Sequence, residues 1–226
     1  AFCRTNQAGP GEGIRGAWLG KLSADGSRLL FGTYTGSTSP TACPRTHAVV
    51  QDRGGKLFIG VVATNWPVTP GAYQTKYHGG RGDFALAKFS PLGSLLAATF
   101  IGGSGFECNG PDTISLDAAG NLLITGGYEF TSVDYPVTPS CLQPVNANPR
   151  GVGQGVFSLL SNDLNALLYS TYMGGSGGDM LRANCVGPDG TLYVAGNATS
   201  TNFPTRNACQ TRRGANNVIA KFSPHL

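Results

Sequence analysis

Three polar residues open the same repeated apolar segment and could together form a binding site. His47 opens "HAVVQ", Asp112 opens "DTISL" and Arg182 opens "RANCV". An imidazole, a carboxylate and a guanidinium held close together can bind a polar ligand or transfer protons. The alternative is that all three are ordinary solvated side chains. The choice depends on whether the segments that carry them converge in the fold.

Two other motifs suggest chemistry but lack the structural context that they need. "GGSGG" at 174–178 matches the nucleophile motif G-x-S-x-G around Ser176, yet that motif requires a strand feeding a helix, and here a strand-like segment follows. "GGSGGDMLR" resembles one calcium-binding nonapeptide with Asp179 as ligand, but such sites need tandem copies, and the preceding "GGSGFECNG" lacks the aspartate. We therefore expect no catalytic residue and no cofactor, and Asp179 is the one metal-ligand candidate.

Composition points to an all-β protein. The chain has 226 residues, of which 34 are Gly and only 12% are charged, and helix-forming Glu and Lys are scarce. The net charge is +4 with the basic residues scattered, so nucleic acid is not an expected partner. No apolar run approaches the roughly 20 residues that span a bilayer, so no transmembrane segment is expected.

Four landmarks recur at intervals of about 65 to 72 residues, as at Gly55, Gly120 and Gly190. They are a strand ending in Thr-aromatic and Gly ("LLFGTYTG", "LLAATFIGG", "LLYSTYMGG"), a Gly turn that feeds an apolar strand, a Pro-rich corner, and a further strand and turn ("GKLSADG", "AKFSPLG", "SLLSNDL", "AKFSPHL"). Each period thus holds four short apolar runs separated by turn residues, which predicts a four-stranded antiparallel meander. Repeated meanders are typical of β-propeller blades.

The Pro-rich corner appears as "NWPVTPGAYQ" (65–74), "DYPVTPSCLQ" (134–143) and "NFPTRNACQ" (202–210). An aromatic residue precedes each first proline: Trp66, Tyr135 and Phe203. We expect the three rings to pack on the blades as pegs, with proline fixing the path of each loop. If they were instead exposed, they would favour a carbohydrate-binding face.

The chain is predicted to be a single repeat domain, 1–226. It would comprise a partial blade (1–36), two repeats (37–103 and 104–175) and a repeat without its last strand (176–226). Three blades and a fragment cannot close a ring, so we expect an open arc or a segment of a larger propeller. Because an open arc leaves edges unprotected, a protein partner or further copies should complete it.

These segments resemble the bacterial seven-bladed β-propeller (SBBP) repeat family. "STYMGGSGGD", "DAAGNLLITGG", "NWPVTPGAYQ" and "DFALAKFSPLG" fit its pattern, and the resemblance covers nearly the whole chain. The resemblance implies a secreted, cell-surface or periplasmic bacterial protein. It supplies no catalytic residues.

Six cysteines form no C-x-x-C pair and lie in loops rich in Gly, Pro and Asn. In a propeller the loop that enters the first strand of a blade and the loop that leaves the second emerge on one face. We therefore predict the disulfides Cys108–Cys141, Cys185–Cys209 and Cys3–Cys43, with partly free thiols as the alternative.

Two surface motifs complete the list of candidates. "RGD" at 81–83 suggests an integrin ligand, but Asp83 lies where each repeat enters a strand, so a structural role is expected. "NAT" at 197–199 is a glycosylation sequon on Asn197.

The functional expectation is a non-enzymatic, exported structural or interaction module. One alternative is a lectin-like surface module that uses the Pro-rich corners. Another is an enzyme or ion-binding domain at the channel mouth formed by His47, Asp112 and Arg182.

Overall fold

The computed structural model describes residues 17–35, 48–107, 111–127, 130–148, 153–210 and 217–223. Within these residues the chain forms thirteen β-strands and no helix, hence none long and apolar enough to cross a membrane. The predicted all-β fold class is confirmed. The strands are β1 (Trp18–Leu22), β2 (Leu29–Tyr34), β3 (Ala48–Gln51), β4 (Leu57–Ala63), β5 (Asp83–Phe89), β6 (Leu95–Ile101), β7 (Thr113–Leu116), β8 (Leu122–Gly126), β9 (Gly155–Leu160), β10 (Leu167–Met173), β11 (Asp179–Val186), β12 (Leu192–Ala198) and β13 (Asn217–Phe222).

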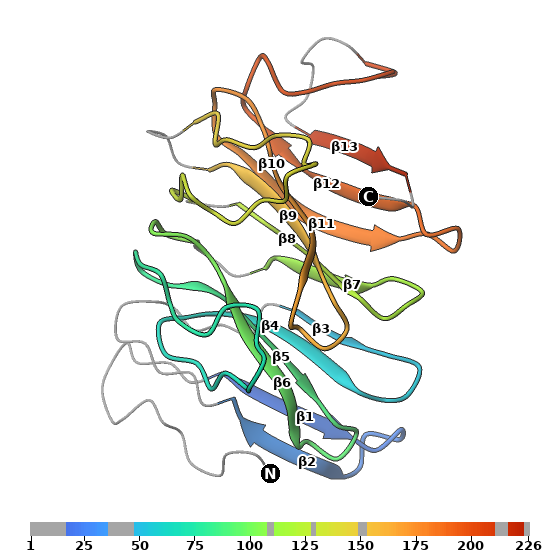
Figure 1. The fold of residues 1–226 in the computed structure, drawn as a ribbon. Coiled ribbons are helices and arrows are strands. Elements are labelled where there is room, and N and C mark those ends of the chain that lie inside the picture. The colour runs from blue at the N-terminus through green and yellow to red at the C-terminus, as the bar shows by residue number, and fades with distance from the viewer. Residues whose placement is uncertain are drawn as a thin grey trace.

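The strands form four antiparallel sheets in which each strand pairs with its neighbour along the chain. We call them blade 1 (β1–β2), blade 2 (β3–β6), blade 3 (β7–β10) and blade 4 (β11–β13). Figure 1 shows the blades stacked in sequence, from blade 1 in blue to blade 4 in orange and red. They are propeller-like blades, and within the described residues they do not close into a ring.

The first strands of successive blades converge on one side of the stack. β7 contacts both β3 and β11, so the inner strands of blades 2, 3 and 4 lie side by side (Figure 1). This is the arrangement that lines the channel of a propeller, and it confirms the predicted role of "HAVVQ", "DTISL" and "RANCV" as inner strands.

The turn after each inner strand has the geometry that its sequence predicts. Gly55, Gly120 and Gly190 have φ of 80°, 81° and 79°, a left-handed conformation that favours glycine. In the first of these turns, Asp52 accepts the backbone N–H of Lys56 at 2.8 Å, which closes the loop and starts β4.

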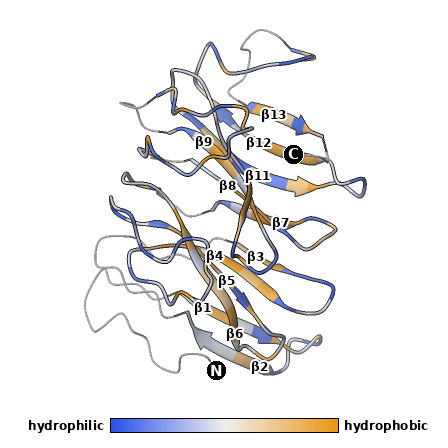
Figure 2. Ribbon diagram, viewed as in Figure 1, coloured by the Kyte–Doolittle hydropathy of each residue, from blue (hydrophilic) through white to orange (hydrophobic). Residues whose placement is uncertain are grey.

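The hydrophobic core consists of three clusters, one between each pair of neighbouring blades. β4 is buried on both faces and its side chains alternate between two of them: Ile59 packs toward blade 1 and Phe58 toward blade 3, beside Leu122. The third cluster joins blades 3 and 4 through Phe157 and Phe222, whose ring centroids lie 4.6 Å apart. In Figure 2 the apolar residues accordingly follow the strands, and hydrophilic residues occupy the connecting loops.

Candidate functional site

The Pro-rich corners lie along the outer strands of blades 2 and 3. The backbone N–H of Thr69 donates to the carbonyl of Ala98 in β6 at 3.1 Å, and the Thr69 hydroxyl accepts the N–H of Ala98 at 2.9 Å. Thr138 makes the same pair of bonds to Ser170 in β10, at 3.1 and 3.2 Å. Each corner therefore pairs with a strand edge that would otherwise be open.

A glutamine at the end of each of these corners fixes the corner to the same outer strand. Gln74 donates its backbone N–H to the hydroxyl of Thr99 at 2.9 Å and accepts the N–H of Gly102 on its side-chain oxygen at 3.0 Å. Gln143 repeats this geometry with Thr171 and Gly174, at 2.9 and 3.1 Å. The corner and the Thr-aromatic-Gly segment recur in the same phase because they bind each other.

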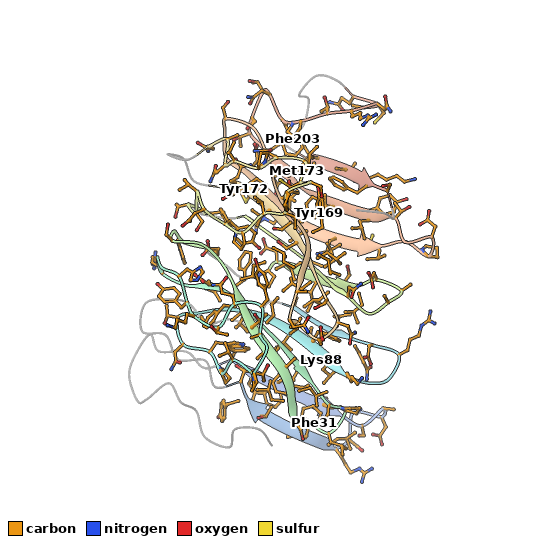
Figure 3. The ribbon with its side chains drawn as sticks, viewed as in Figure 1. Phe31, Lys88, Tyr169, Tyr172, Met173 and Phe203 are labelled. Carbon is orange, nitrogen blue, oxygen red and sulfur yellow. The ribbon has the colours of Figure 1, made fainter. Side chains whose placement is uncertain are left out.

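The aromatic pegs are inside the protein. Trp66 is buried and donates its indole N–H to the carbonyl of Leu86 at 3.1 Å. Tyr135 is buried with its hydroxyl 3.0 Å from that of Ser158. Phe203 is partly buried against the third cluster, in the same region as Met173 (Figure 3). The peg prediction is confirmed. Because Trp66 and Tyr135 are buried, these two rings do not form the exposed carbohydrate-binding face that was the alternative.

Asp112 and Arg182 are brought together on the inner strands. Asp112 immediately precedes β7, Arg182 lies in β11, and their Oδ1 and Nη1 atoms are 3.8 Å apart. Next to them, the hydroxyl of Ser115 donates to the side-chain oxygen of Asn184 at 2.6 Å. His47, the third predicted member, lies outside the described residues.

The environment of Asp112 disfavours its charge. Burial raises the pKa of the carboxyl group to about 6, and the guanidinium of Arg182 opposes that rise. The second carboxyl oxygen of Asp112 is buried and has no hydrogen-bond partner among the described residues. A polar group facing this inner surface could bind there, which keeps the pair as a binding candidate.

Asp179 is occupied by hydrogen bonds. Its Oδ1 accepts the N–H groups of Thr199 and Ser200 at 2.9 and 3.1 Å, and its Oδ2 accepts the N–H of Gly175 at 2.6 Å and the hydroxyl of Ser200. Those four donors occupy the lone pairs that a cation would need. The described part of the chain also contains no group of three or more His, Cys, Asp or Glu residues suited to a metal. The hydrogen bonds of Asp179 give it a structural role, in which it holds the crossover between β10 and β11.

The sequence analysis missed a buried pair of acids, Asp83 and Glu107. Both are fully buried, Asp83 at the start of β5 and Glu107 in the crossover at 102–107 that follows β6. Glu107 accepts the N–H of Gly103 at 3.1 Å and a hydroxyl from Ser132, as Asp179 does from Gly175 and Ser200. An alignment of "GGSGFE" with "GGSGGD" places Glu107 at the repeat position of Asp179 and is the sequence signal for this pair.

The "RGD" segment is structural. Asp83 is buried, and the guanidinium of Arg81 lies 4.9 Å from the centre of the Phe106 ring. Gly80, the residue before Arg81, has φ of 69° and packs so closely on the carbonyl of Gly105 that a side chain could not fit. The loop before β5 is thereby held against the crossover, and Asp83 is not presented to a partner.

A pocket of about 380 Å³ opens between the corners of blades 2 and 3. Tyr73, Lys76, His78 and Asp134 lie in its lining, and Gly102 separates it from the carboxyl group of Asp83. Its size suits a small ligand, and both corners contribute polar side chains to an otherwise apolar lining.

The cysteine pairing differs from the prediction. Cys185 and Cys209 are both exposed free thiols. Cys185 pairs with Tyr193 at the turn between β11 and β12, whereas Cys209 follows the opposite end of β12, so the length of the strand separates them. Cys141 is also a free thiol, and its predicted partner Cys108, like Cys3 and Cys43, lies outside the described residues.

Both ends of the arc expose apolar residues on a sheet face. In blade 1, Trp18 and Leu22 are 51% and 58% exposed, and the indole of Trp18 rests on the cross-strand pair Gly20 and Gly32. In blade 4, Ile219 is 76% exposed on the outward face of β13. We call these the N-end face and the C-end face.

No protein-family model matches this sequence, and no curated protein matches it.

Proposed function

We propose that this chain is a non-enzymatic β-propeller scaffold that functions by association through its two end faces. The faces would bind a matching blade face, carried by a further copy of the chain or by a protein partner. One observation carries the proposal: residues exposed at each end occupy repeat positions that are buried in blades 2 and 3.

The N-end face supports this through β1. Leu22 precedes the Ser of the strand-and-turn landmark, the position held by Phe89 in blade 2 and Leu160 in blade 3. Phe89 and Leu160 are fully buried between blades, whereas Leu22 is 58% exposed. An apolar side chain at this position is therefore one that the repeat covers with a neighbouring sheet.

The C-end face supports it through β13. Alignment of "NVIAKF" with β5 and β9 makes Ile219 equivalent to Leu86 and Phe157. Those two are fully buried against the next blade, and Ile219 is 76% exposed. Covering the side chain of Ile219 would contribute about 2 kcal/mol, since a buried aliphatic side chain is worth roughly that amount.

A further copy is the occupant that the repeat favours. The C-end face corresponds to the face that blade 2 presents to blade 3, and the N-end face to the face that blade 3 presents to blade 2. Joining the C-end of one copy to the N-end of another would thus reproduce an interface already formed within the chain. Two copies would contribute twice the four sheets, which is within the range of about 4 to 8 blades found in propellers.

The test uses three variants and analytical ultracentrifugation. Trp18→Asp alters the N-end face, Ile219→Asp the C-end face, and Leu92→Asp is the matched control on an 83% exposed turn residue. Each end-face variant should weaken self-association at least about tenfold, because it would bury a carboxylate against apolar side chains, and the control should behave like the unaltered chain.

Mixing the two end-face variants makes the test specific for head-to-tail contact. The mixture still contains one intact C-end face and one intact N-end face on different molecules, so a dimer with a single interface should form. Equal association of all three variants would exclude the end faces as the binding surface. Failure of the mixture to dimerise would exclude head-to-tail association.

We further propose that the protein is exported by a bacterium, a proposal supported by the resemblance of its repeats to secreted and surface-associated propellers.

A further inference from the structure

The buried acids Asp83 and Glu107 join three segments of the chain. Asp83 Oδ2 accepts the side-chain N–H of Gln74 at 2.8 Å and the backbone N–H of His78 at 3.0 Å. Glu107 Oε1 accepts the N–H of Gly103 and the hydroxyl of Ser132. The pair thus links the corner of blade 2, the crossover and the loop between β8 and β9 of blade 3.

Each acid also has one oxygen without a donor. Asp83 Oδ1 and Glu107 Oε2 are buried and have no hydrogen-bond partner among the described residues. The two acids lie side by side, because the backbone N–H of Glu107 donates to the carbonyl of Gly82, the residue before Asp83, at 3.2 Å; each carboxyl group also acts on the pKa of the other. Two ionised carboxylates cannot satisfy each other, because both only accept hydrogen bonds and their like charges repel in a medium of low polarity. A proton on one of them turns the contact into a hydrogen bond.

The next crossover carries an amide in place of one of the two acids, and the Nε2 atom of that amide has no hydrogen-bond partner among the described residues. Gln154 occupies the repeat position of Asp83, and Asp179 that of Glu107. A methyl group placed on Gly174 would touch both the Nε2 atom of Gln154 and the Oδ2 atom of Asp179, so the two side chains lie together beside it. At this repeat position blade 3 has the N–H donor of Gln154, whereas blade 2 has the carboxyl group of Asp83. A carboxyl oxygen can act as a donor only when it is protonated.

We propose that Asp83 and Glu107 share a single proton, and that this proton is a pH-sensitive latch that fastens the corner of blade 2 to the crossover leading to blade 3. Loss of the proton leaves two buried negative charges and no donor between them. The segments released are those that the pair holds through Gln74, His78 and Ser132.

The electrostatics of the pair set the direction of the switch. Burial raises the pKa of Asp83 to about 6 and that of Glu107 well above its usual range. His78 lowers the pKa of Asp83, and Asp83 raises that of Glu107. Among the described residues, Tyr77 and Tyr135 also interact with the pair, as does Tyr172, which faces Asp134 as well.

The raised pKa values of Asp83 and Glu107 mean that stability falls as pH rises. Because both folded-state pKa values exceed those of the unfolded chain, the stabilisation is fully present in acid and is lost as pH rises through the folded-state values. The latch is therefore closed at mildly acidic pH and opens as the medium becomes alkaline.

The test is the melting temperature of the full chain from pH 5 to pH 9, in the unaltered protein and in Glu107→Gln and Asp83→Asn. The unaltered chain should lose several degrees as pH rises, and both amide variants should lose markedly less, because an amide supplies the donor at every pH. Two variants are used so that a packing defect in one does not decide the result. His78→Gln removes the imidazole ring but keeps the backbone N–H that binds Asp83, and this control should keep the pH dependence of the unaltered chain.

A gain-of-function variant completes the design. Gln154→Glu rebuilds the acid pair in the next crossover and should add a new loss of stability at alkaline pH. Hydrogen exchange at pH 8 should be faster in residues 102–107 of the unaltered chain than in Glu107→Gln. Identical pH profiles for the unaltered chain and both amide variants would overturn the proposal. So would a rise in melting temperature at pH 8 on adding calcium that Glu107→Gln abolishes, because a cation rather than a proton would then join the acids.

Discussion

The side-chain oxygen of Gln74 accepts the backbone N–H of Gly102, and this bond ties the end of a corner to the end of the outer strand of the same blade. The same glutamine donates to the carbonyl of Lys76 and to Asp83. The side chain of Gln74 thus joins the corner, β5 and the crossover by hydrogen bonds.

Gln74→Ala should lower the free energy of unfolding by about 2 kcal/mol, since it leaves the buried Gly102 N–H without its acceptor. The control is Gln51→Ala, which alters an exposed glutamine of β3 and should change stability by less than about 0.5 kcal/mol. Urea unfolding measures both. Equal losses in the two variants would show that the corner is not fastened through Gln74.

Removal of the buried peg in blade 2 should be more costly. Trp66→Ala leaves a cavity in the cluster between blades 1 and 2 and removes the bond to Leu86, so we expect a loss of about 3 to 5 kcal/mol. Trp66→Phe should cost less because most of the packing remains. If Trp66→Ala instead left the unfolding free energy unchanged and removed glycan binding, the lectin-like function would regain support.

Asp112→Asn should stabilise the protein at pH 8 and have little effect at pH 3, below the pKa of the unfolded chain. Burial raises the folded-state pKa of Asp112 to about 6, so its contribution to stability is lost as pH rises through that value, and the amide does not ionise. Melting curves at the two pH values provide the measurement. Destabilisation by Asp112→Asn at pH 8 would mean that the ion pair with Arg182 outweighs burial.

Cys185 and Cys209 should react with a thiol reagent in the native protein, because both thiols are free and exposed. Cys141 should react more slowly, since it is only partly exposed. Peptide mass mapping after alkylation identifies the modified residues. A Cys185–Cys209 cross-linked peptide from unreduced protein would contradict the structure.

The fold was predictable because its signals are local and repeated. The Gly turns and apolar runs each specify a turn or a strand without reference to distant residues, and three copies in common phase identify the meander. The burial of Trp66 and Tyr135 followed from the same regularity. The pairing of Asp112 with Arg182 was also predictable, because both open inner strands that converge.

What the sequence could not supply depends on distances across a blade. Cys185 and Cys209 were predicted to meet on one face of the blade. Cys185 instead lies near the turn between β11 and β12, at the far end of β12 from Cys209. Asp83 and Glu107 belong to different segments, and only the packing of the crossover against the start of β5 brings their carboxyl groups together. Asp179 was a ligand candidate because "GGSGGDMLR" resembles a calcium-binding nonapeptide. The motif does not show that Thr199 and Ser200, some twenty residues further along, donate to its carboxylate.

Association through the end faces of the arc requires a native mass greater than that of one chain. Light scattering across a concentration series should give a mass of two or more copies, or of one copy with another polypeptide, against a chain mass of 23.4 kDa. A mass of one chain at every concentration, including in protein purified from its own source, would contradict the account.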